Sequence, residues 1–291
     1  MRVALVTGCA GFLGRNMTKC LLADGWQVRG VDLPSANWSE VDHRVEGLEV
    51  DIADLSSDDS ILKDVNAAFY FSGLADNRPA LSRPLEYLDT NTRSFAQFLE
   101  AVRGSGLPKV LFASSSAVYA PHNRPMGEDA KCDPANPYGL SKMLSENIAS
   151  HWRKVYGLPT VSLRIFQCYG PGAVFGGAVT GFFNRHQEGL PLTVVGDGSQ
   201  VRDFIHVDDV CEGFLRVAEA DQFADIYNLG TGQHTTILDL AQLIDPDNIE
   251  FLAPRDGDVP MMLADMSRFK ADMGWLPEIT LVDGVGHLLK T

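Results

Sequence analysis

The sequence predicts an α/β fold in which a doubly wound parallel sheet carries a smaller, discontinuous C-terminal lobe. Through the first two thirds of the chain, short apolar runs typical of buried strands alternate with longer segments of helical spacing. A glycine-rich loop joins the first strand to the first helix. After Arg164 the alternation stops and glycines and prolines become frequent, which indicates the lobe.

The apolar runs and the helical stripes follow one another in a regular order. Strands are predicted at 2–7, 27–31, 46–50, 67–72, 110–114 and 160–164, and helices at 12–24, 85–104 and 138–156. The last helix carries Leu140, Leu144, Ile148 and Trp152 at four-residue steps, which gives it one apolar face. Consecutive strands separated by helices belong to a parallel sheet that is covered on both faces.

Beyond the break, the chain is expected to leave the sheet domain, return to it and leave it again. A helical segment at 206–220 and a strand at 226–229 restore the earlier pattern. We therefore predict a sheet domain over 1–166 and 206–240 and a lobe over 167–205 and 241–291.

The composition of the 291 residues is that of a globular protein, with 45% hydrophobic and 21% charged residues, and it excludes a disordered or fibrous chain. The 24 basic and 38 acidic residues give a net charge of −14. Such a surface repels phosphate backbones and anionic lipids, so nucleic acids and membranes are not expected as partners. A phosphate-bearing ligand must then bind through local groups.

The chain shows no pattern for export, membrane insertion or metal binding. The first apolar run, Val3–Val6, is too short for the core of a signal peptide, and no stretch reaches the ~20 apolar residues of a membrane span. The five cysteines are odd in number and form no Cys-x-x-Cys pair, so neither disulfides nor a zinc site is predicted. Reduced thiols in a cytoplasmic protein are expected.

Gly8, Gly11 and Gly14 form the loop after the first strand, and Phe12 and Leu13 open the helix that follows. The first two glycines allow a tight turn and the close approach of a diphosphate, and the third lets the helix pack on the strands. The helix N-terminus supplies free N–H groups for an anion, without basic side chains. The position of the loop therefore predicts a dinucleotide site.

Asp32 ends the second strand, about twenty residues beyond the glycine loop. A carboxylate at this place accepts hydrogen bonds from a ribose diol and repels a 2′-phosphate. The following residues, 33–35, supply no arginine to bind such a phosphate. The sequence therefore favours NAD over NADP.

Tyr138 and Lys142 share one face at the start of the long helix, since they are four residues apart. The lysine ammonium and the helix N-terminus are expected to lower the phenol pKa from ~10, and a bound nicotinamide cation would lower it further. Tyr138 would then serve as a base near neutral pH, although such a pair also occurs on helix surfaces without a role. Ser114, Ser115 and Ser116 follow the strand at 110–114, at the edge where α/β sheets bind ligands.

Together these features resemble the extended short-chain dehydrogenase/reductase superfamily, and most closely its NAD-dependent sugar-nucleotide epimerase/dehydratase branch. The resemblance covers nearly the whole chain. Further matching segments are Asp51-Ile52, Ser72-Gly73-Leu74-Ala75, Asn91, residues 163–171, residues 196–209, Arg255-Asp256-Gly257-Asp258 and Gly274-Trp275.

The resemblance implies a Rossmann fold, NAD as cofactor, a nucleotide sugar as substrate and no metal. The cofactor residues that it implies are Gly8, Gly11, Phe12, Leu13, Gly14, Asp32, Asp51, Ile52, Ser72, Gly73, Leu74, Ala75, Asn91, Ser114, Tyr138 and Lys142. The implied substrate residues are Ser115, Ser116, Gln167, Arg202, Arg255 and Asp258, with the two arginines clamping the diphosphate. Helices 85–104 and 138–156 resemble the pair that forms a homodimer interface in this family, and their apolar stripes fit packing within the domain equally well.

The residues before Val118 separate the reactions of this branch. Related 4,6-dehydratases carry Thr-Asp-Glu there, decarboxylating relatives place Glu where Ala117 stands, and 3,5-epimerase/reductases use a cysteine there with NADP. Ser115, Ser116 and Ala117 supply neither the carboxylates nor the cysteine. The resemblance therefore predicts a 4-epimerase for a UDP- or dTDP-hexose, although Gln167 replaces the family's asparagine and Ala120 its glycine.

The implied mechanism is transient oxidation at C4 of the sugar. Tyr138 takes the hydroxyl proton, Ser115 bridges the tyrosine and the sugar oxygen, and Lys142 holds the nicotinamide ribose. The 4-keto sugar rotates and is reduced again on its other face. Two alternatives are an NAD(P)-dependent ketosugar-nucleotide reductase and a non-catalytic Rossmann sensor, which usually lacks the tyrosine or the lysine.

Overall fold

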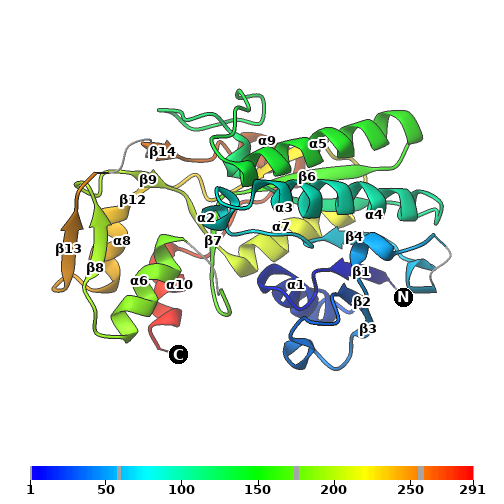
Figure 1. Ribbon diagram of the computed structural model, residues 1–291, viewed down its shortest axis with the longest axis horizontal. Coiled ribbons are helices and arrows are strands. Elements are labelled where there is room, and N and C mark those ends of the chain that lie inside the picture. The colour runs from blue at the N-terminus through cyan, green and yellow to red at the C-terminus, as the bar shows by residue number, and fades with distance from the viewer. Residues whose placement is uncertain (1, 58–59, 174–176, 255–258, 291) are drawn as a thin grey trace.

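The computed structural model describes residues 2–57, 60–173, 177–254 and 259–290 (Figure 1). Its central sheet has seven strands in the order β3-β2-β1-β4-β5-β6-β11, and every neighbouring pair is parallel. The strands are β1 (Val3–Thr7), β2 (Gln27–Asp32), β3 (Glu46–Glu49), β4 (Ala67–Tyr70), β5 (Val110–Ser115), β6 (Thr160–Ile165) and β11 (Ile226–Leu229). The predicted Rossmann fold is therefore confirmed.

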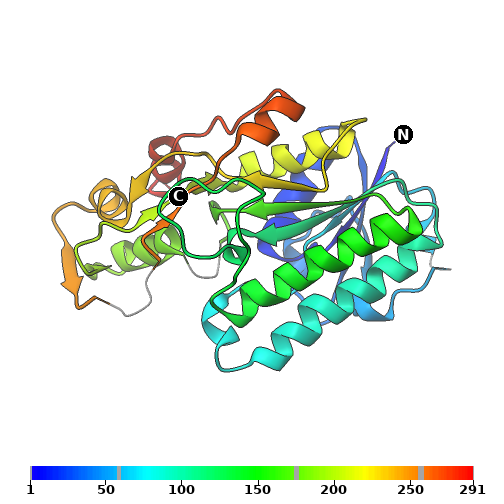
Figure 2. The same ribbon diagram turned by 90° about the horizontal axis from the view of Figure 1, so that it is seen from above.

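Helices cover both faces of this sheet because its central strands are apolar on both sides. Along β1, Ala4 and Val6 lie in one core with α1 (Phe12–Ala23) and α7 (Val207–Glu219). Leu5 lies in the second core, against α4 (Ser94–Arg103) and α5 (Pro137–Tyr156). Figure 2 shows α4 and α5 side by side along one face of the sheet, in cyan-green and green.

The helix predicted at 85–104 is not a single α-helix. It consists of α3 (Pro84–Leu88), a π-helical turn η4 (Asp89–Arg93) and α4. The wider turn places Asn91 inside the protein, where its side chain bonds to the segment after β4. Sequence spacing does not reveal this interruption, because its cause is a tertiary contact.

The lobe lies on the left of Figure 1, beyond the carboxyl ends of the sheet strands. Its own apolar core joins α6 (Ala178–Gln187), α8 (Ile237–Ile244) and α10 (Leu281–Leu288). Three small sheets complete it: β7 (Gln167–Tyr169) with β10 (Phe204–His206), β8 (Leu192–Val195) with β13 (Ile249–Leu252), and β12 (Thr235–Thr236), β9 (Val201–Arg202) and β14 (Met261–Met262).

Packing bears on where the two units divide. The apolar residues of α8 lie in the core of the lobe, so this packing favours a division before α8 over the predicted one at residue 240. Phe269, on α9 (Ser267–Met273), and Trp275 lie in the core beside the central sheet instead. The division into two discontinuous units stays a prediction.

Asp203 joins three segments where the lobe meets the sheet. Its side chain is fully buried and accepts hydrogen bonds from the Thr231 N–H at 2.7 Å, the Gly232 N–H at 2.9 Å and the Ala264 N–H at 3.0 Å. The Thr231 hydroxyl is a further donor at 2.6 Å. Removing this carboxylate would leave several buried donors without a hydrogen-bond partner.

We expect Asp203→Ala to lower the free energy of unfolding by about 3 kcal/mol, the range for loss of a buried hydrogen-bond network. Urea unfolding followed by circular dichroism measures this. Asp197→Ala is the matched control, since Asp197 belongs to the same segment but is exposed. Equal stability of the two variants would contradict the assigned role of Asp203.

Among the described residues, no helix has the length and apolar character to cross a membrane. Within the same residues, no group of three or more His, Cys, Asp or Glu side chains is arranged to hold a metal ion. The five cysteines are free thiols.

Candidate active site

The glycine loop lies at the carboxyl end of β1, where the strand order reverses between β1 and β4. Gly8 has a left-handed backbone with φ +65°, and its N–H donates to a carbonyl of β2 at 2.8 Å. A Cβ on Gly14 would stand 2.0 Å from the Gly8 carbonyl oxygen, so α1 needs glycine there to approach β1. Gly11 gives α1 no side-chain cap, which leaves N–H groups of the first turn, at Phe12 and Leu13, for an anion.

Asp32 lies next to this loop at the end of β2. Its carboxylate accepts the Ala10 N–H at 2.9 Å and the Leu33 N–H at 2.8 Å, which fixes it against the loop. Asp51 follows the neighbouring strand β3 and caps the short turn η2 (Ile52–Asp54) by accepting a backbone N–H at 2.9 Å. Both carboxylates lie at the same sheet edge, and their contact with an adenosine stays a prediction.

One buried side chain holds the segment 72–75, which follows β4. Asn91 is 2% exposed, accepts the Leu74 N–H at 2.7 Å and donates to the Leu74 carbonyl at 3.0 Å. It also donates to the Ser141 hydroxyl at 2.9 Å, which ties the segment to α5. The structure thus gives Asn91 a supporting place, and its predicted direct contact with a cofactor stays a prediction.

Ser115, Tyr138 and Lys142 come together at the carboxyl end of β5. α5 starts beside this edge because Asn136 caps it, accepting the Gly139 N–H at 2.9 Å. The Ser115 hydroxyl is near enough to the Tyr138 phenol to lower the pKa of the phenol by hydrogen bonding. Lys142 is buried, with its Nζ 5.9 Å from the centre of the Tyr138 ring. The structure therefore brings together the three residues predicted to carry the chemistry.

The two neighbouring serines point elsewhere. Ser114 is buried and its hydroxyl donates to the Glu146 carboxylate on α5. Ser116 is buried at the start of the turn η5 (Ser116–Val118). The predicted contacts of Ser114 with cofactor and of Ser116 with substrate therefore stay predictions, whereas Ser115 is the serine that lowers the pKa of the tyrosine.

The pKa of Tyr138 in the protein chain alone is raised, not lowered as predicted. Burial raises the pKa of the phenol, and the hydrogen bond with Ser115 offsets only part of this. Lys142 donates to the Ala113 carbonyl at 2.8 Å, and burial lowers the pKa of its ammonium to about 8. Helical spacing showed that the two side chains are neighbours, but it did not show that they are removed from water. The predicted lowering of the Tyr138 pKa therefore depends on the positive charge of a bound cofactor.

Gly139 is a site residue that the sequence motifs did not single out. A Cβ there would stand 2.2 Å from the Ala117 carbonyl oxygen and 2.9 Å from the Pro134 side chain. α5 can therefore touch η5, and Tyr138 can reach Ser115, only with glycine next to the tyrosine. The sequence signal was the Tyr-Gly pair itself, which shows no close approach on its own.

We expect Gly139→Ala to lower kcat by about a hundredfold, because a shift of about 1 Å separates the tyrosine from the serine. Turnover of the expected nucleotide sugar and the content of the expected cofactor, NAD, in the purified protein measure the two effects, and NAD content should persist. Gly181→Ala on α6 is the control, since a Cβ there meets open space. A Gly139→Ala variant with the kcat of this control would contradict the expectation.

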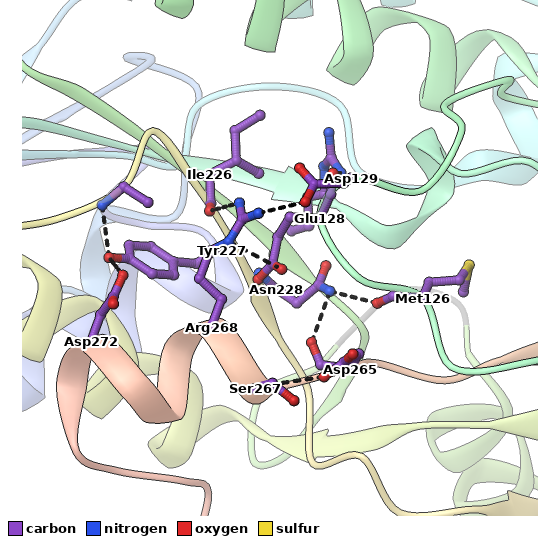
Figure 3. A network of polar contacts seen from close by, with 12 residues as sticks. Met126, Glu128, Asp129, Ile226, Tyr227, Asn228, Asp265, Ser267, Arg268 and Asp272 are labelled. Carbon is purple, nitrogen blue, oxygen red and sulfur yellow. Dashed lines mark hydrogen bonds and ion pairs between the residues drawn. The ribbon is translucent and has the colours of Figure 1, made fainter.

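The chain between the serines and Tyr138 makes a long excursion, residues 120–136, and Figure 3 shows how part of it is held. Asn228 on β11 donates to the Met126 carbonyl at 2.7 Å and, through its backbone N–H, to the Glu128 carboxylate at 2.8 Å. Arg268 on α9 donates to the Asp129 carboxylate at 3.1 Å. The excursion is therefore fixed on both the sheet and α9 before the chain enters α5.

The predicted substrate residues lie on the lobe side. Gln167 on β7 faces Gly177 at the start of α6, with its Oε1 3.8 Å from the place of a Cβ there. Arg202 on β9 is half-buried, and it donates to the Val201 carbonyl at 2.8 Å and the Val259 carbonyl at 2.9 Å. The remaining two predicted residues, Arg255 and Asp258, lie outside the described residues.

Comparisons with known proteins agree with this architecture. The model of the NAD dependent epimerase/dehydratase family matches residues 4–230. A UDP-glucuronate 4-epimerase from Thermodesulfobacterium geofontis is 30% identical over 301 residues, covering 97% of this chain and 93% of the relative.

Solved structures superpose over nearly the whole chain. A UDP-N-acetylglucosamine 4-epimerase from Methanobrevibacter ruminantium, in complex with UDP-N-acetylmuramic acid, has a TM-score of 0.90 and 27% identity, covering 99% of this chain and 98% of that one. A UDP-glucuronic acid 4-epimerase from Bacillus cereus, in complex with UDP-glucuronic acid and NAD, has a TM-score of 0.88 and 27% identity, covering 98% and 96%. With the glycine loop and the Ser115–Tyr138–Lys142 arrangement in place, the chain belongs to the NAD dependent epimerase/dehydratase family.

Proposed function

We propose that the protein is an NAD-dependent sugar-nucleotide 4-epimerase, an isomerase for a UDP- or dTDP-hexose. The observation that carries the proposal is the assembly of Ser115, Tyr138 and Lys142 at the carboxyl end of β5. Ala117 in η5 supplies no carboxylate for a dehydration. The similarity to named UDP-sugar 4-epimerases over nearly the full length of the chain supports the same reaction.

The cofactor side of the site fits NAD. Free N–H groups of the first turn of α1 suit the diphosphate, and Asp32 suits a ribose diol while repelling a 2′-phosphate. Lys142 would hold the nicotinamide ribose. When bound, NAD accepts a hydride from the sugar carbon and gives it back.

The protein residues move the proton. The Tyr138 phenolate takes the proton of the C4 hydroxyl, and the Ser115 hydroxyl holds the sugar oxygen against the tyrosine. After the 4-keto sugar has rotated so that its other face is presented, the Tyr138 phenol returns the proton to the oxygen at C4. The positive charge of Lys142 favours the phenolate throughout.

The lobe holds the nucleotide end of the substrate in this proposal. Residues 167–205 and 237–291 form the substrate unit, and 1–166 with 206–236 form the NAD-binding unit; the boundary lies before α8, and not at residue 240, because α8 packs in the lobe. Arg202 and Arg255 are proposed to bind the diphosphate, with Gln167 and Asp258 beside them. The five free thiols support a reducing, cytoplasmic location.

A panel of nucleotide sugars, incubated without added NAD and analysed by NMR, tests the activity. Because the relatives are named for glucuronate, glucose and N-acetylglucosamine, the panel includes these sugars on uridine and thymidine diphosphate. We expect one C4 pair to interconvert without added cofactor. Turnover that requires stoichiometric NAD(P)H would instead identify a reductase.

We also propose that the enzyme is a homodimer formed through α3, α4 and α5. An apolar groove between these helices is lined by Leu85, Leu88, Ala96, Leu144 and Ile148, and Leu85 is 78% exposed. A second copy placed by a two-fold axis would bury the same apolar face on both chains. Glu86, Asp89 and Arg93 also line the groove, and Glu86 and Arg93 form ion pairs within the chain, with Arg83 and Asp89.

Light scattering after gel filtration tests the dimer. We expect twice the chain mass for the wild type and one chain mass for the double variant Leu85→Glu/Leu144→Glu, because the charges cannot be buried. Val282→Glu is the control, since Val282 is similarly exposed but lies on α10 in the lobe. A wild type that elutes as one chain would refute the dimer.

A further inference from the structure

A buried ion pair joins α5 to β6, one helical turn beyond Lys142. The Arg164 guanidinium on β6 donates to both oxygens of the Glu146 carboxylate on α5, from Nε at 2.9 Å and from a terminal nitrogen at 2.7 Å. The two side chains are 4% and 5% exposed. Arg164 also donates to the Glu128 carbonyl at 2.9 Å, which links the pair to the excursion shown in Figure 3.

Glu146 and Lys142 form hydrogen bonds with consecutive residues at the end of β5. Lys142 donates to the Ala113 carbonyl at 2.8 Å, and the Ser114 hydroxyl donates to the Glu146 carboxylate one helical turn further along α5. Ser114 and Arg164 are direct neighbours across the β5–β6 pair. These contacts together fix the strand immediately before Ser115.

Stability alone does not explain such a pair. Taking two charges out of water costs several kcal/mol per ion, and well-packed apolar residues of similar volume often stabilise a core as well or better. The neighbours of Arg164 on β5 and β11, Ser114 and Asn228, are buried polar side chains without charge, so the ion pair belongs to a polar cluster at this end of the sheet. A charge pair retained beneath the reacting groups therefore calls for a role in the reaction.

We propose that Glu146 is a positioning residue for the epimerase reaction: held by Arg164, it fixes the end of β5 beneath Ser115 and faces Lys142 with a negative charge. This inference rests on the proposed function. Glu146 touches neither the sugar nor the cofactor in this proposal. It acts through Ser114, which orients the strand leading to Ser115, and through Lys142, which it keeps positively charged.

The electrostatics agree with this geometry. Burial lowers the pKa of Lys142 to about 8, and the Glu146 carboxylate opposes that shift. The titratable and charged groups that face this part of the protein are Tyr138 and Glu146 on α5, Tyr87 on α3, Tyr119 after η5, Glu128 and the Cys132 thiol in the excursion, and Arg164 on β6. Without the carboxylate, Lys142 would lose its proton at a lower pH.

The pH dependence of kcat in two opposite variants tests the proposal. Lys142 must be protonated, so activity falls as pH rises through the pKa of Lys142. Glu146→Gln is expected to move this basic limb down by about one pH unit, and Arg164→Met to move it up, because the carboxylate is then left unpaired. KM should stay within about threefold in both variants. The proposal would be overturned if the basic limb of kcat moved in the same direction in both variants, or moved in neither.

Two further variants keep the test decisive if a lone buried charge prevents folding. Glu146→Gln/Arg164→Met removes both charges at nearly constant shape, and its basic limb is expected below that of the wild type. Ser114→Ala keeps both charges and removes only the hydroxyl, and its kcat is expected to fall about tenfold with unchanged KM. Wild-type kcat and pH profiles in both variants would overturn the proposal.

Phenolate absorbance of the NAD-loaded protein separates this inference from the proposed function. The part of the signal that is lost in Tyr138→Phe reports the ionisation of Tyr138 whether or not a sugar is epimerised. The pH midpoint of this signal is expected to be higher in Glu146→Gln, because Lys142 then loses its positive charge at lower pH and no longer favours the phenolate. In Arg164→Met the midpoint is expected to be lower, because Lys142 keeps its charge to higher pH. Unchanged midpoints would overturn the role of Glu146, whereas a wild type that epimerises no sugar would refute only the proposed activity.

Discussion

Replacing Tyr138 with phenylalanine is expected to lower kcat for epimerisation by about three orders of magnitude. The phenol is the group proposed to move the C4 hydroxyl proton, since Ser115 lowers its pKa and Lys142 lies beside it. The ring itself remains, so substrate KM and the NAD content of the protein should change little. Initial rates on the best substrate of the panel, with NAD content measured after denaturation, check both statements.

Tyr156→Phe is the matched control for this variant, because Tyr156 lies at the other end of α5 and is 48% exposed. Its kcat should equal that of the wild type. If Tyr138→Phe kept more than about a tenth of the wild-type kcat, another group would have to carry the proton and the proposed mechanism would be wrong.

Gly14→Ala is expected to yield protein without bound NAD and with a lower Tm. The new Cβ would stand 2.0 Å from the Gly8 carbonyl oxygen and 2.7 Å from Cys9 Cα, and neither backbone atom can move unless the loop opens. Opening the loop also displaces the first-turn N–H groups proposed to hold the cofactor diphosphate. NAD content and a thermal melt measure the two effects.

Gly286→Ala on α10 is the control for Gly14→Ala, since a Cβ there meets open space and alanine favours a helix. Its Tm and NAD content should be no lower than those of the wild type. A Gly14→Ala protein that retains stoichiometric NAD would show that the loop does not form the cofactor site as described.

The sheet domain could be predicted because its signals are local. Strands β1, β4 and β5 carry the clearest apolar runs, and each of the strands β1 to β6 and β11 lies within about two residues of its predicted position. The lobe was predicted as a region without its internal order, because its strands have only two to four residues. Strands that short leave no periodic pattern to read.

The candidate site divides in the same way. Tyr138 and Lys142 were found from their spacing, and Ser115 from its place at the end of a predicted strand and from the family resemblance, whereas Gly139 and Glu146 were not found. Gly139 is required by a backbone approach from another segment, and Glu146 appears in the sequence as an ordinary polar residue of an amphipathic helix. Its buried partner on β6 becomes visible only once the strands are paired.

The excursion 120–136 connects the lobe to Tyr138, the proposed base. Met126 pairs with Leu263 and Asp265, and His122 bridges to Met261, whose strand β14 pairs with β9 of the lobe. The same excursion ends at the cap of α5, next to Tyr138. A chimaera that takes its sugar lobe from a relative would therefore have to import residues 120–136 together with the lobe to keep the tyrosine in register.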